Sequence, residues 1–339
     1  MTDGPLVSIV TPCLNHVRFV EATMQSVLMQ DYPNIEYLVV DGGSTDGSLD
    51  VVRRHANRIA WWTSEPDAGQ AAAINKGLRR SRGEIVAWLN SDDLYYRPDV
   101  VSRAVAALRA SPAVGMVYAD GVMVDEGGLL LDWHRYRRYD LIDLLSFEVL
   151  LQPTVFLRRA VVEQAGYLDE SLSLILDHAL WIRAAALGPL QHVPEVWAVE
   201  RTHPSAKTIA LAQDFVEEAR ELLARLAGES SFAGAFAGHR RKIEAGFHVF
   251  AGRRYIDAGR GSDALRHFRR ALALHAPSAL RVWYKVVQAG GLALGAGRLF
   301  LGYRSLRRRM KHRSKKLVIS GSSTRWLSSR EEQHDRRPG

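Results

Sequence analysis

Residues 35–47 read IEYLVVDGGSTDG, an apolar run that ends in an aspartate and a glycine-rich polar turn. The same arrangement occurs at residues 6–15, LVSIVTPCLN, and at residues 85–93, IVAWLNSDD. Short runs rich in Val, Ile and Leu are typical of strands that are buried on both faces of a sheet. In open α/β sheets, ligands bind just beyond the carboxyl ends of such strands. These stretches therefore predict both the fold class and the place of the functional site.

Segments with helical spacing of apolar residues separate the strands over the first 120 residues. This alternation predicts an α/β fold with a mainly parallel sheet between flanking helices. It weakens in residues 121–200, where residues 123–133 are typical of a hairpin. The expected strands are Leu6–Val10, Ile35–Val40, Ile59–Thr63, Ile85–Leu89, Val114–Tyr118, Gln152–Leu157 and Gln191–Val199, and the expected helices are Phe19–Gln30, Ser48–Ala56, Gln70–Arg80, Pro98–Ala110 and Asp177–Ala186.

The composition of the 339-residue chain is that of an ordinary globular protein, with 47% hydrophobic and 24% charged residues. Its one cysteine, Cys13, excludes an intrachain disulfide framework and favours a reducing compartment. The net charge of +8 is unevenly divided, because residues 1–200 hold 17 basic and 26 acidic side chains and the remainder holds 28 basic and 11 acidic ones. The second half therefore suits an anionic surface.

Asp92 and Asp93 stand side by side where a predicted strand ends. Two adjacent carboxylates repel each other, and a hard cation such as Mg²⁺ or Mn²⁺ relieves that repulsion while it binds phosphate oxygens of a substrate. A turn, or a cap of the helix near Pro98, explains the same residues without a ligand. Because three other strand ends are polar as well, we favour the metal site.

Two further segments are open to two interpretations. Residues 41–47 can present backbone N–H groups to an anion or form a simple turn, and they lack the glycine spacing of dinucleotide folds and P-loops. The polar face of residues 67–76, which carries Gln70, Asn75 and Lys76, either holds a diphosphate or faces solvent.

Residues 6–208, about 60% of the chain, resemble family-2 glycosyltransferases with the GT-A fold. The resemblance implies an inverting, metal-dependent enzyme that moves a sugar from a nucleotide diphosphate to an acceptor hydroxyl. It rests on the order and spacing of the motifs VSIVTPCLN, QDYPNIEYLVVDGGSTDGS, DAGQAAAINKGL, GEIVAWLNSDD, QPTVFLRR, GYLDESL, LDHALWIR and RTHPSAKT.

The resemblance also implies roles for single residues. Asp177 would be the catalytic base that takes the proton of the acceptor hydroxyl. Asp93 and His203 would hold the Mn²⁺ or Mg²⁺ ion that stabilises the leaving diphosphate. The nucleotide-sugar would be bound by Thr11, Pro12, Asn15, Asp41, Asp67, Gln70, Asn75 and Asp92, and Asp120 and Gln152 would lie on the acceptor or sugar side.

The substrates are less closely specified. Ala179 and Leu176 stand where many relatives carry an acidic residue, so the acceptor preference stays open. Uridine is the commonest donor base among relatives, which favours a UDP-sugar, and a glycan or glycolipid of the cell envelope is the expected acceptor. Two alternatives remain. One is a nucleotide-sugar- or glycan-binding protein without turnover, and the other is a nucleotidyltransferase, which would need a basic, glycine-rich phosphate loop in place of TPCLN.

Residues 209–319 form the expected second domain, a helical and basic extension, and residues 320–339 are polar and predict a disordered tail. Residues 256–273 are similar to one tetratricopeptide-repeat hairpin. Between Lys285 and Arg298 lie twelve uncharged residues, fewer than the roughly 20 of a membrane span.

Residues 286–316 combine an apolar stretch with a basic cluster. They suit either the surface of an anionic membrane or a packed helix with a solvated tail. A nucleic-acid partner is not expected, because the aromatic residues of a base-stacking surface are absent. The N-terminal apolar run after Asp3 favours a buried strand over a secretory signal, so the expected location is cytoplasmic, at the inner face of the cell membrane.

Overall fold

The computed structural model describes residues 4–203, 211–296, 315–320 and 323–327. The chain divides into two compact units. The sheet unit comprises residues 1–138, 150–202 and 312–339, and the helical unit comprises residues 139–149 and 203–311. The division after residue 202 lies near the predicted boundary at 208, but residues 139–149 belong to the helical unit.

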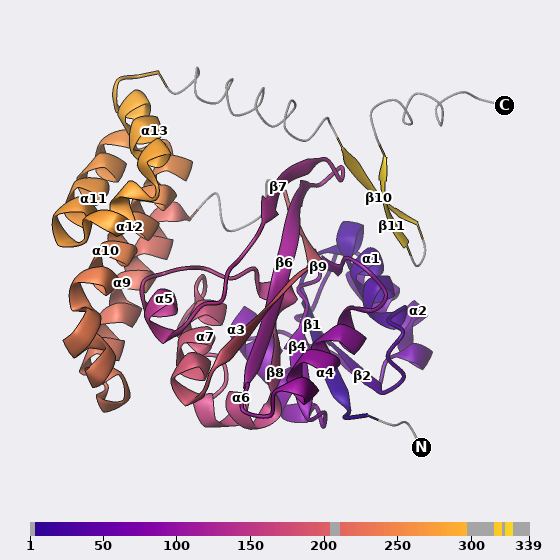
Figure 1. The fold of residues 1–339 in the computed structure, drawn as a ribbon. Coiled ribbons are helices and arrows are strands. Elements are labelled where there is room, and N and C mark those ends of the chain that lie inside the picture. The colour runs from indigo at the N-terminus through magenta and orange to yellow at the C-terminus, as the bar shows by residue number, and fades with distance from the viewer. Residues whose placement is uncertain (1–3, 204–210, 297–314, 321–322, 328–339) are drawn as a thin grey trace. The chain divides into compact units, whose positions relative to one another are not determined.

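Nine strands of the described residues form the sheet (Figure 1): β1 (Val7–Cys13), β2 (Ile35–Asp41), β3 (Trp61–Ser64), β4 (Ile85–Trp88), β5 (Leu94–Tyr95), β6 (Met116–Asp125), β7 (Leu130–His134), β8 (Phe156–Arg158) and β9 (Leu190–Thr202). Their order is β3-β2-β1-β4-β8-β6-β9-β5, with β7 beside β6. β3, β2, β1 and β4 run parallel, as do β6 and β9, whereas β5, β7 and β8 pair antiparallel. The four parallel strands therefore end at the same edge.

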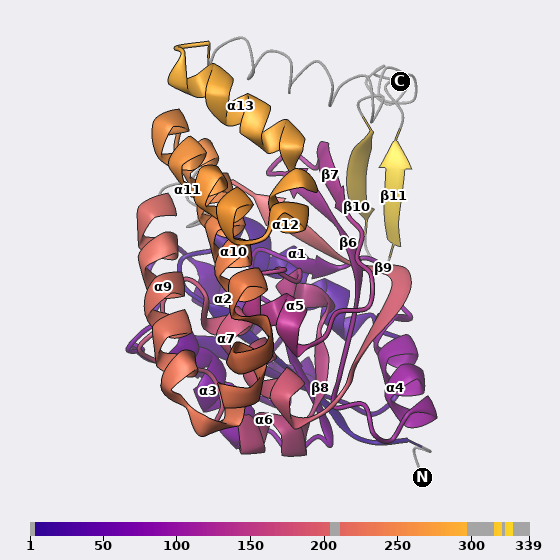
Figure 2. The ribbon, with the colours of Figure 1, turned by 60° about the vertical axis from the view of Figure 1, so that its left-hand side comes forward.

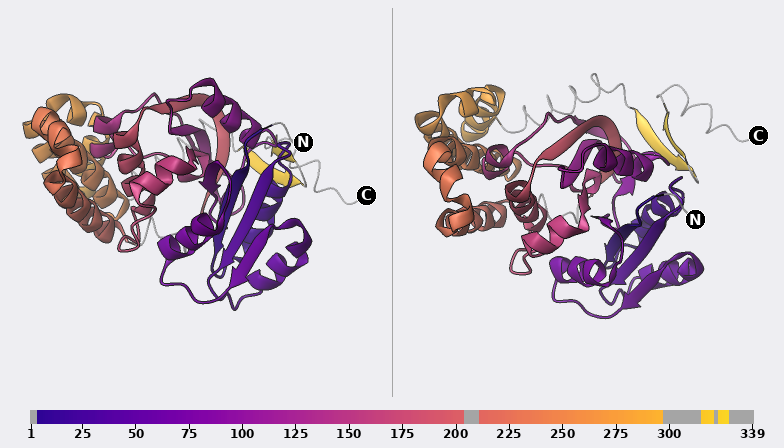
Figure 3. Two further views of the ribbon diagram at one scale, coloured as in Figure 1. Left: turned by 90° about the horizontal axis from the view of Figure 1, so that it is seen from below. Right: turned by 60° about the horizontal axis from the view of Figure 1, so that its bottom comes forward.

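The helices of this unit are α1 (Val17–Leu28), α2 (Ser48–Arg54), α3 (Gln70–Arg80), α4 (Val100–Ala110), α6 (Arg159–Ala165) and α7 (Leu176–Leu187). Side chains of β1 alternate between two apolar layers. Val7 and Ile9 share a core cluster with α1, α2 and α4. Val10 contacts Gly77 of α3, where a Cβ would lie 2.4 Å from a Val10 methyl group. Helices thus cover both faces of the sheet (Figure 3).

The structure corrects the sequence prediction for two segments. The strand expected over Gln152–Leu157 begins only at Phe156, because Gln152–Thr154 form a 3-10 turn that contains a proline. The disorder expected from Ser320 fails for Ser323–Leu327, or β11, which pairs antiparallel with β10 (Lys316–Ser320). Strand β10 is itself anchored, since Leu317 is 4% exposed in the cluster around β6, β7 and β9. The rest of the tail lies outside the described residues.

The helical unit contains α5 (Leu141–Leu145), α9 (Ala212–Gly228), α10 (Ala233–Asp257), α11 (Gly261–Leu274), α12 (Ala276–Leu280) and α13 (Trp283–Ala293), as Figure 2 shows. Helices α10 and α11 form an antiparallel pair, in which a Cβ on Gly252 would lie 2.8 Å from the Phe268 ring. The hairpin predicted at residues 256–273 therefore includes the end of a longer first helix. No helix of the described ranges is long and apolar enough to cross a membrane.

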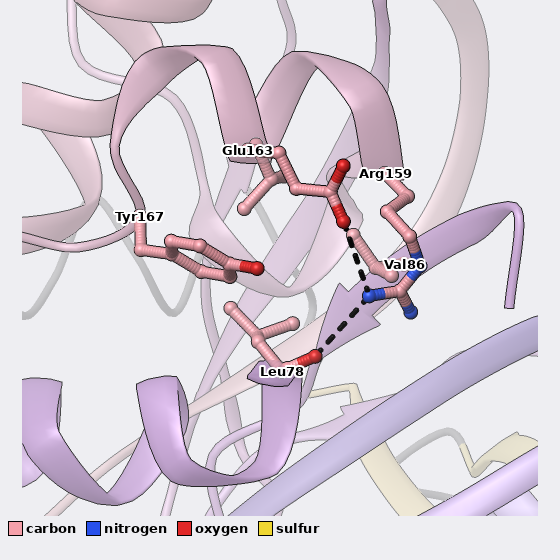
Figure 4. Close-up of a pocket in the computed structure, with 6 residues that line it drawn as sticks. Leu78, Val86, Arg159, Glu163 and Tyr167 are labelled. Atoms are coloured by element: carbon pink, nitrogen blue, oxygen red, sulfur yellow. Dashed lines mark hydrogen bonds and ion pairs between the residues drawn. The ribbon is translucent and has the colours of Figure 1, made fainter. Parts of the chain in front are cut away.

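Arg159 fastens α6 to the end of α3. Its guanidinium donates hydrogen bonds to the carbonyl oxygens of Gly83 at 2.6 Å and Leu78 at 3.3 Å, and to the Ser81 hydroxyl at 2.7 Å. Carbonyl groups in the last turn of a helix lack intrahelical donors, so this arginine satisfies one of them. Figure 4 shows the small recess beside it, which Tyr167 also lines. This contact holds α6 against the sheet at the end opposite the polar strand ends.

Glu36 of β2 connects three neighbouring segments at that same end of the sheet. Its carboxylate accepts hydrogen bonds from the Ser8 hydroxyl at 2.6 Å and from the backbone N–H and Nε of Arg82, both at 2.7 Å. Burial raises the pKa of Glu36, but these hydrogen bonds and the charge of Arg82 outweigh it, so the pKa is lowered overall.

We predict that Glu36→Gln lowers the free energy of unfolding near neutral pH and matters less in acid. A carboxylate with a lowered pKa in the folded state contributes stability above its ordinary pKa of about 4.3. That contribution is lost as the pH falls through the lowered value. Urea unfolding of both proteins across this range tests the prediction, with the exposed Glu84→Gln as control. If the difference in free energy of unfolding between wild type and Glu36→Gln does not change with pH, the prediction is contradicted.

Candidate active site

Hydrogen bonds between side chains and backbone hold the loops after β1 and β2 together. The backbone N–H of Asn15 donates to the Ser44 hydroxyl and its Oδ1 accepts from the Thr45 N–H, both at 2.9 Å. The N–H of His16 donates to the Ser48 hydroxyl, also at 2.9 Å. Asn15 has a φ of 55°, a conformation that asparagine tolerates better than most residues. The polar ends of β1 and β2 thus form one continuous surface.

Asp41, the last residue of β2, organises the glycine-rich turn that follows it. Its Oδ2 accepts hydrogen bonds from the N–H groups of Gly43 at 3.2 Å and Ser44 at 3.0 Å, and from the Ser64 hydroxyl at 2.6 Å. Its Oδ1 is buried and has no donor among the described residues. A buried acceptor without a donor costs about 1–3 kcal/mol, which a ligand or water that reaches it would relieve.

Asp67 repeats this arrangement in the loop after β3. Lys76 of α3 forms an ion pair with Oδ1 of Asp67, while Oδ2 is buried without a donor in the described part of the chain. This Oδ2 lies beside Gly42, where a Cβ would be 3.6 Å away. Gln70, at the start of α3, donates to Asn90 Oδ1 at 3.0 Å and so ties this loop to the end of β4. Two acceptors without donors therefore flank the glycine turn.

His16, Asp92 and His203 come from three distant parts of the sequence and meet in space. Each offers one ligand atom, and these atoms all lie within 4.8 Å of one another. His16 follows β1, Asp92 follows β4, and His203 is joined by its peptide bond to Thr202, the last residue of β9. Ser91 is hydrogen-bonded to Nδ1 of His16 at 2.7 Å and orients the ring. One carboxylate and two imidazoles at this spacing can bind a divalent metal ion.

Asp93, which was predicted as a metal ligand, lies in a different environment. It is 5% exposed, and its Oδ1 accepts the backbone N–H of Arg201 at 3.2 Å. Burial raises the pKa of Asp93 well above its ordinary value, and the charges of Asp92 and Glu200 raise it further. Asp92, expected to bind the nucleotide-sugar, is the half-buried carboxylate of the pair and the one in the histidine cluster. Of the two carboxylates, Asp92 is the one that offers a ligand atom to this cluster.

Arg201 holds the backbone beneath this cluster. Its Nε donates to the carbonyl oxygen of Asp92, and its Nη2 donates to the Phe19 carbonyl and the Thr23 hydroxyl, both at 3.2 Å. Thr23 in turn donates to the carbonyl oxygen of Asp93 at 2.6 Å. Burial lowers the pKa of Arg201 to about 10, although Asp93 and Asp92 act in the opposite direction. The guanidinium is thus still charged at neutral pH.

Asp177 lies in the first turn of α7, where a negative charge interacts favourably with the helix dipole. The N-cap residue of α7 is Ile175, so Asp177 is not the cap. One turn later, Trp181 is fully buried and stacks on Trp88 of β4, with ring centroids 5.0 Å apart. Residues four apart share a helix face. The face that carries Asp177 therefore packs on the strand that leads to Asp92.

The two residues expected on the acceptor or sugar side are both held by neighbours. Asp120 Oδ1 is hydrogen-bonded to Nε2 of His192 at 2.8 Å and accepts the N–H of Tyr136 at 2.9 Å. Gln152 donates from Nε2 to the carbonyl oxygen of Trp88 at 2.9 Å. Its Oε1 is buried and has no donor within the described ranges. The Oε1 atom of Gln152 is thus an acceptor near the end of β4 that a ligand or water could use.

Three residues predicted to bind the nucleotide-sugar belong to the core instead. Thr11 is fully buried, and its hydroxyl accepts a hydrogen bond from Tyr37 at 3.0 Å. Pro12 is buried in the same strand. Asn75 is fully buried, with Nδ2 donating to the carbonyl oxygen of Leu168 at 2.9 Å and Oδ1 accepting its N–H at 3.0 Å. Internal hydrogen bonds thus engage the polar side-chain groups of Thr11 and Asn75.

Sequence reasoning missed His16 and Arg201, although both adjoin motifs that it identified. His16 directly follows TPCLN, and Arg201 opens RTHPSAKT. The position of His16 after a predicted strand was the available signal, since histidine is a common metal ligand. No local pattern marks Arg201, whose partners are far away in the sequence. The site is therefore larger than the set of strand-end carboxylates that suggested it.

The sequence profile described as glycosyl transferase family 2 matches residues 8–165. An uncharacterized glycosyltransferase of Mycobacterium tuberculosis is 30% identical over 190 residues, which cover 55% of this chain and 71% of that protein. This chain belongs to glycosyl transferase family 2. The predicted family and enzyme class are thereby confirmed.

Solved structures of similar fold include two complexes with nucleotide ligands. Staphylococcus aureus TarS, residues 1–349 with UDP, is 16% identical with a TM-score of 0.57 and covers 95% of this chain and 96% of that one. The mannosyltransferase PcManGT of Pyrobaculum calidifontis, with GDP-Man and Mn²⁺, is 24% identical with a TM-score of 0.56. The match covers 87% of this chain and 88% of that one. At these identities the likeness concerns the fold alone, and it confirms the predicted GT-A architecture.

We predict that Asn75→Ala lowers the free energy of unfolding by about 2 kcal/mol, because it leaves both backbone groups of Leu168 buried without partners. The exposed Asn57→Ala serves as control and should change stability by no more than about 0.5 kcal/mol. Chemical denaturation of the three proteins provides the measurement. Equal stabilities of the two variants would contradict the structural role of Asn75.

Proposed function

We propose that this family 2 enzyme transfers a sugar from a UDP-sugar to a hydroxyl group of a glycan or glycolipid, with inversion at the anomeric carbon. The cluster of His16, Asp92 and His203 beside the polar strand ends carries the proposal. Among proteins of similar fold, TarS binds UDP, and PcManGT binds GDP-Man with Mn²⁺. These complexes support a nucleotide-sugar donor and a divalent cation for the present chain.

The three ligand residues suit Mn²⁺ better than Mg²⁺. Mg²⁺ is usually bound through carboxylates, water and phosphate oxygens, whereas two of the three donors here are imidazoles. A bound divalent ion supplies charge stabilisation for the leaving diphosphate. Asp92 therefore takes the role that the sequence suggested for Asp93, and His203 keeps its proposed role.

The nucleoside is proposed to bind beside the glycine turn after β2. Oδ2 of Asp67 and Oδ1 of Asp41 are acceptors without donors among the described residues, so N–H or O–H groups of the base and ribose would satisfy them. Asn15 is exposed in the loop that faces this turn, and Gln70 begins the helix next to it. These four residues keep their predicted place on the donor side.

Asp177 is proposed to accept the proton of the acceptor hydroxyl. As that oxygen forms its bond to the anomeric carbon, the bond from this carbon to the diphosphate breaks on the opposite face, and the configuration inverts. Asp120 and Gln152 are assigned to the sugar or acceptor side. The family assignment disfavours a nucleotidyltransferase, and turnover separates an enzyme from a protein that only binds nucleotide-sugars.

The acceptor is proposed to lie at the inner face of the cell membrane, as part of the cell envelope. The charge of the second half supports this proposal, because its 28 basic residues against 11 acidic ones suit an anionic lipid surface. No nucleic acid is proposed as a partner.

We predict that UDP with Mn²⁺ raises the melting temperature of the wild type and that Asp92→Asn abolishes this effect. A ligand at 100 times its Kd adds about 2.7 kcal/mol to the free energy of unfolding. Asp93→Asn is the matched variant at the next position, and it should keep the metal-dependent shift. The reverse pattern would restore Asp93 as the metal ligand.

A second prediction concerns Asp177→Asn, which should lower kcat by about 10²–10⁴-fold, the usual size of a general-base contribution. Stabilisation by UDP and Mn²⁺ should stay unchanged, since Asp177 is assigned to the acceptor. Glu163→Gln, a carboxylate variant on α6 with a half-exposed side chain (51%), provides the control for both measurements. Unchanged turnover in Asp177→Asn would eliminate this residue as the base.

A further inference from the structure

The last described helices of the helical unit carry large apolar side chains on their outward side. Leu280 and Trp283 are 60% and 64% exposed, Tyr284 and Val287 are 49% and 54% exposed, and Leu294 is 87% exposed. Trp283 and Val287 lie four residues apart on α13, the spacing of one helical face, and Tyr284 adjoins Trp283. Leu280 ends α12 just before α13 begins, and Leu294 directly follows α13. We call these five residues the apolar face.

The opposite side of α13 already packs within the helical unit. Ala289 is fully buried. A Cβ on Gly261, the first residue of α11, would lie 2.4 Å from the backbone nitrogen of Ala293 and 2.6 Å from the carbonyl oxygen of Ala289. The two backbones therefore meet directly at this glycine. Because α13 is held by this other side, the core of the unit does not explain why these large apolar side chains are exposed, and such exposure concentrated in one short segment is typical of a contact with a partner.

The sequence around the apolar face carries only positive charge. Between Asp263 and Glu331 there are 16 Lys and Arg residues and no Asp or Glu. Lys285 belongs to the same short segment, as does Arg281, which is ion-paired with Glu148. The Lys285 ammonium lies 5.8 Å from the centroid of the Tyr284 ring. Trp and Tyr with long basic side chains are the combination found where hydrocarbon meets anionic headgroups. A nucleic acid would not bury Leu and Val side chains, since it binds through stacking and phosphate contacts.

We propose that the apolar face docks on the surface of an anionic lipid bilayer. Trp283 and Tyr284 enter the boundary between headgroups and acyl chains together with Leu280 and Val287, while nearby cations contact the lipid phosphates. This inference rests on the proposed function in one respect, because a glycolipid acceptor lies in that surface. The docking itself requires neither donor nor metal.

Cosedimentation of the full chain with lipid vesicles tests the proposal. We expect binding to vesicles of phosphatidylcholine with phosphatidylglycerol, weaker binding at high salt, and little binding to phosphatidylcholine alone. Trp283→Ser combined with Tyr284→Ser should lower the partition coefficient at least roughly tenfold, because two large side chains no longer become buried. The matched control is Val149→Ser with Leu187→Ser, at positions that are 40% and 46% exposed, and it should bind as the wild type does.

Two results would overturn the proposal. One is equal partition of the wild type and both double variants. The other is a wild-type chain that does not bind vesicles but self-associates in sedimentation velocity, while Trp283→Ser is monomeric. The apolar face would then join two copies of the chain. Stabilisation by UDP and Mn²⁺ is measured on the same proteins. Its retention in a variant that does not bind vesicles shows that the variant is folded, and it separates the docking surface from the donor site.

Discussion

One buried cation, the guanidinium of Arg201, fixes the geometry on which the candidate site depends. It donates hydrogen bonds to the carbonyl oxygens of Asp92 and Phe19, and so joins the end of β9 to the loop after β4 and to the first turn of α1. His16 precedes Phe19 by three residues and His203 follows Arg201 by two. Ligand atoms from three distant segments keep their positions only when the backbone beneath them is held, and this arginine holds all three segments.

The same network explains why the sequence identifies the carboxylate pair but does not tell its two members apart. Side chains alternate between faces along a strand, yet β4 ends at Trp88, before the pair begins. In the turn that follows, the direction of each side chain depends on its partners. Asp93 turns inward, where its Oδ1 accepts the backbone N–H of Arg201, a residue 108 positions away in the sequence. Nothing within NSDD distinguishes Asp92 from Asp93.

Most strands and helices of residues 1–120 were predictable from the period of the apolar residues, and α3 begins and ends where expected, whereas the two-residue strand β5 and helix α6 were not predicted. Polar residues inside these elements were not predictable. Asn75 and Thr11 have the character of ligand-binding residues, but their polar groups complete bonds to Leu168 and Tyr37. Similarly, Ser323–Leu327 are polar in composition and become a strand through pairing. In each case the deciding partner is defined only by the fold.

The division of charge along the chain acquires a physical meaning when the two proposals are combined. The acidic half supplies the carboxylates that hold the strand-end loops and a cation, and an anionic surface repels it. The basic half contains no acidic residue between Asp263 and Glu331, and the same surface attracts it. Electrostatic attraction acts over about a Debye length, whereas apolar burial acts only on contact. In the combined proposal, charge therefore determines which half of the chain approaches the lipid, and burial of Trp283 and its neighbours stabilises the bound state.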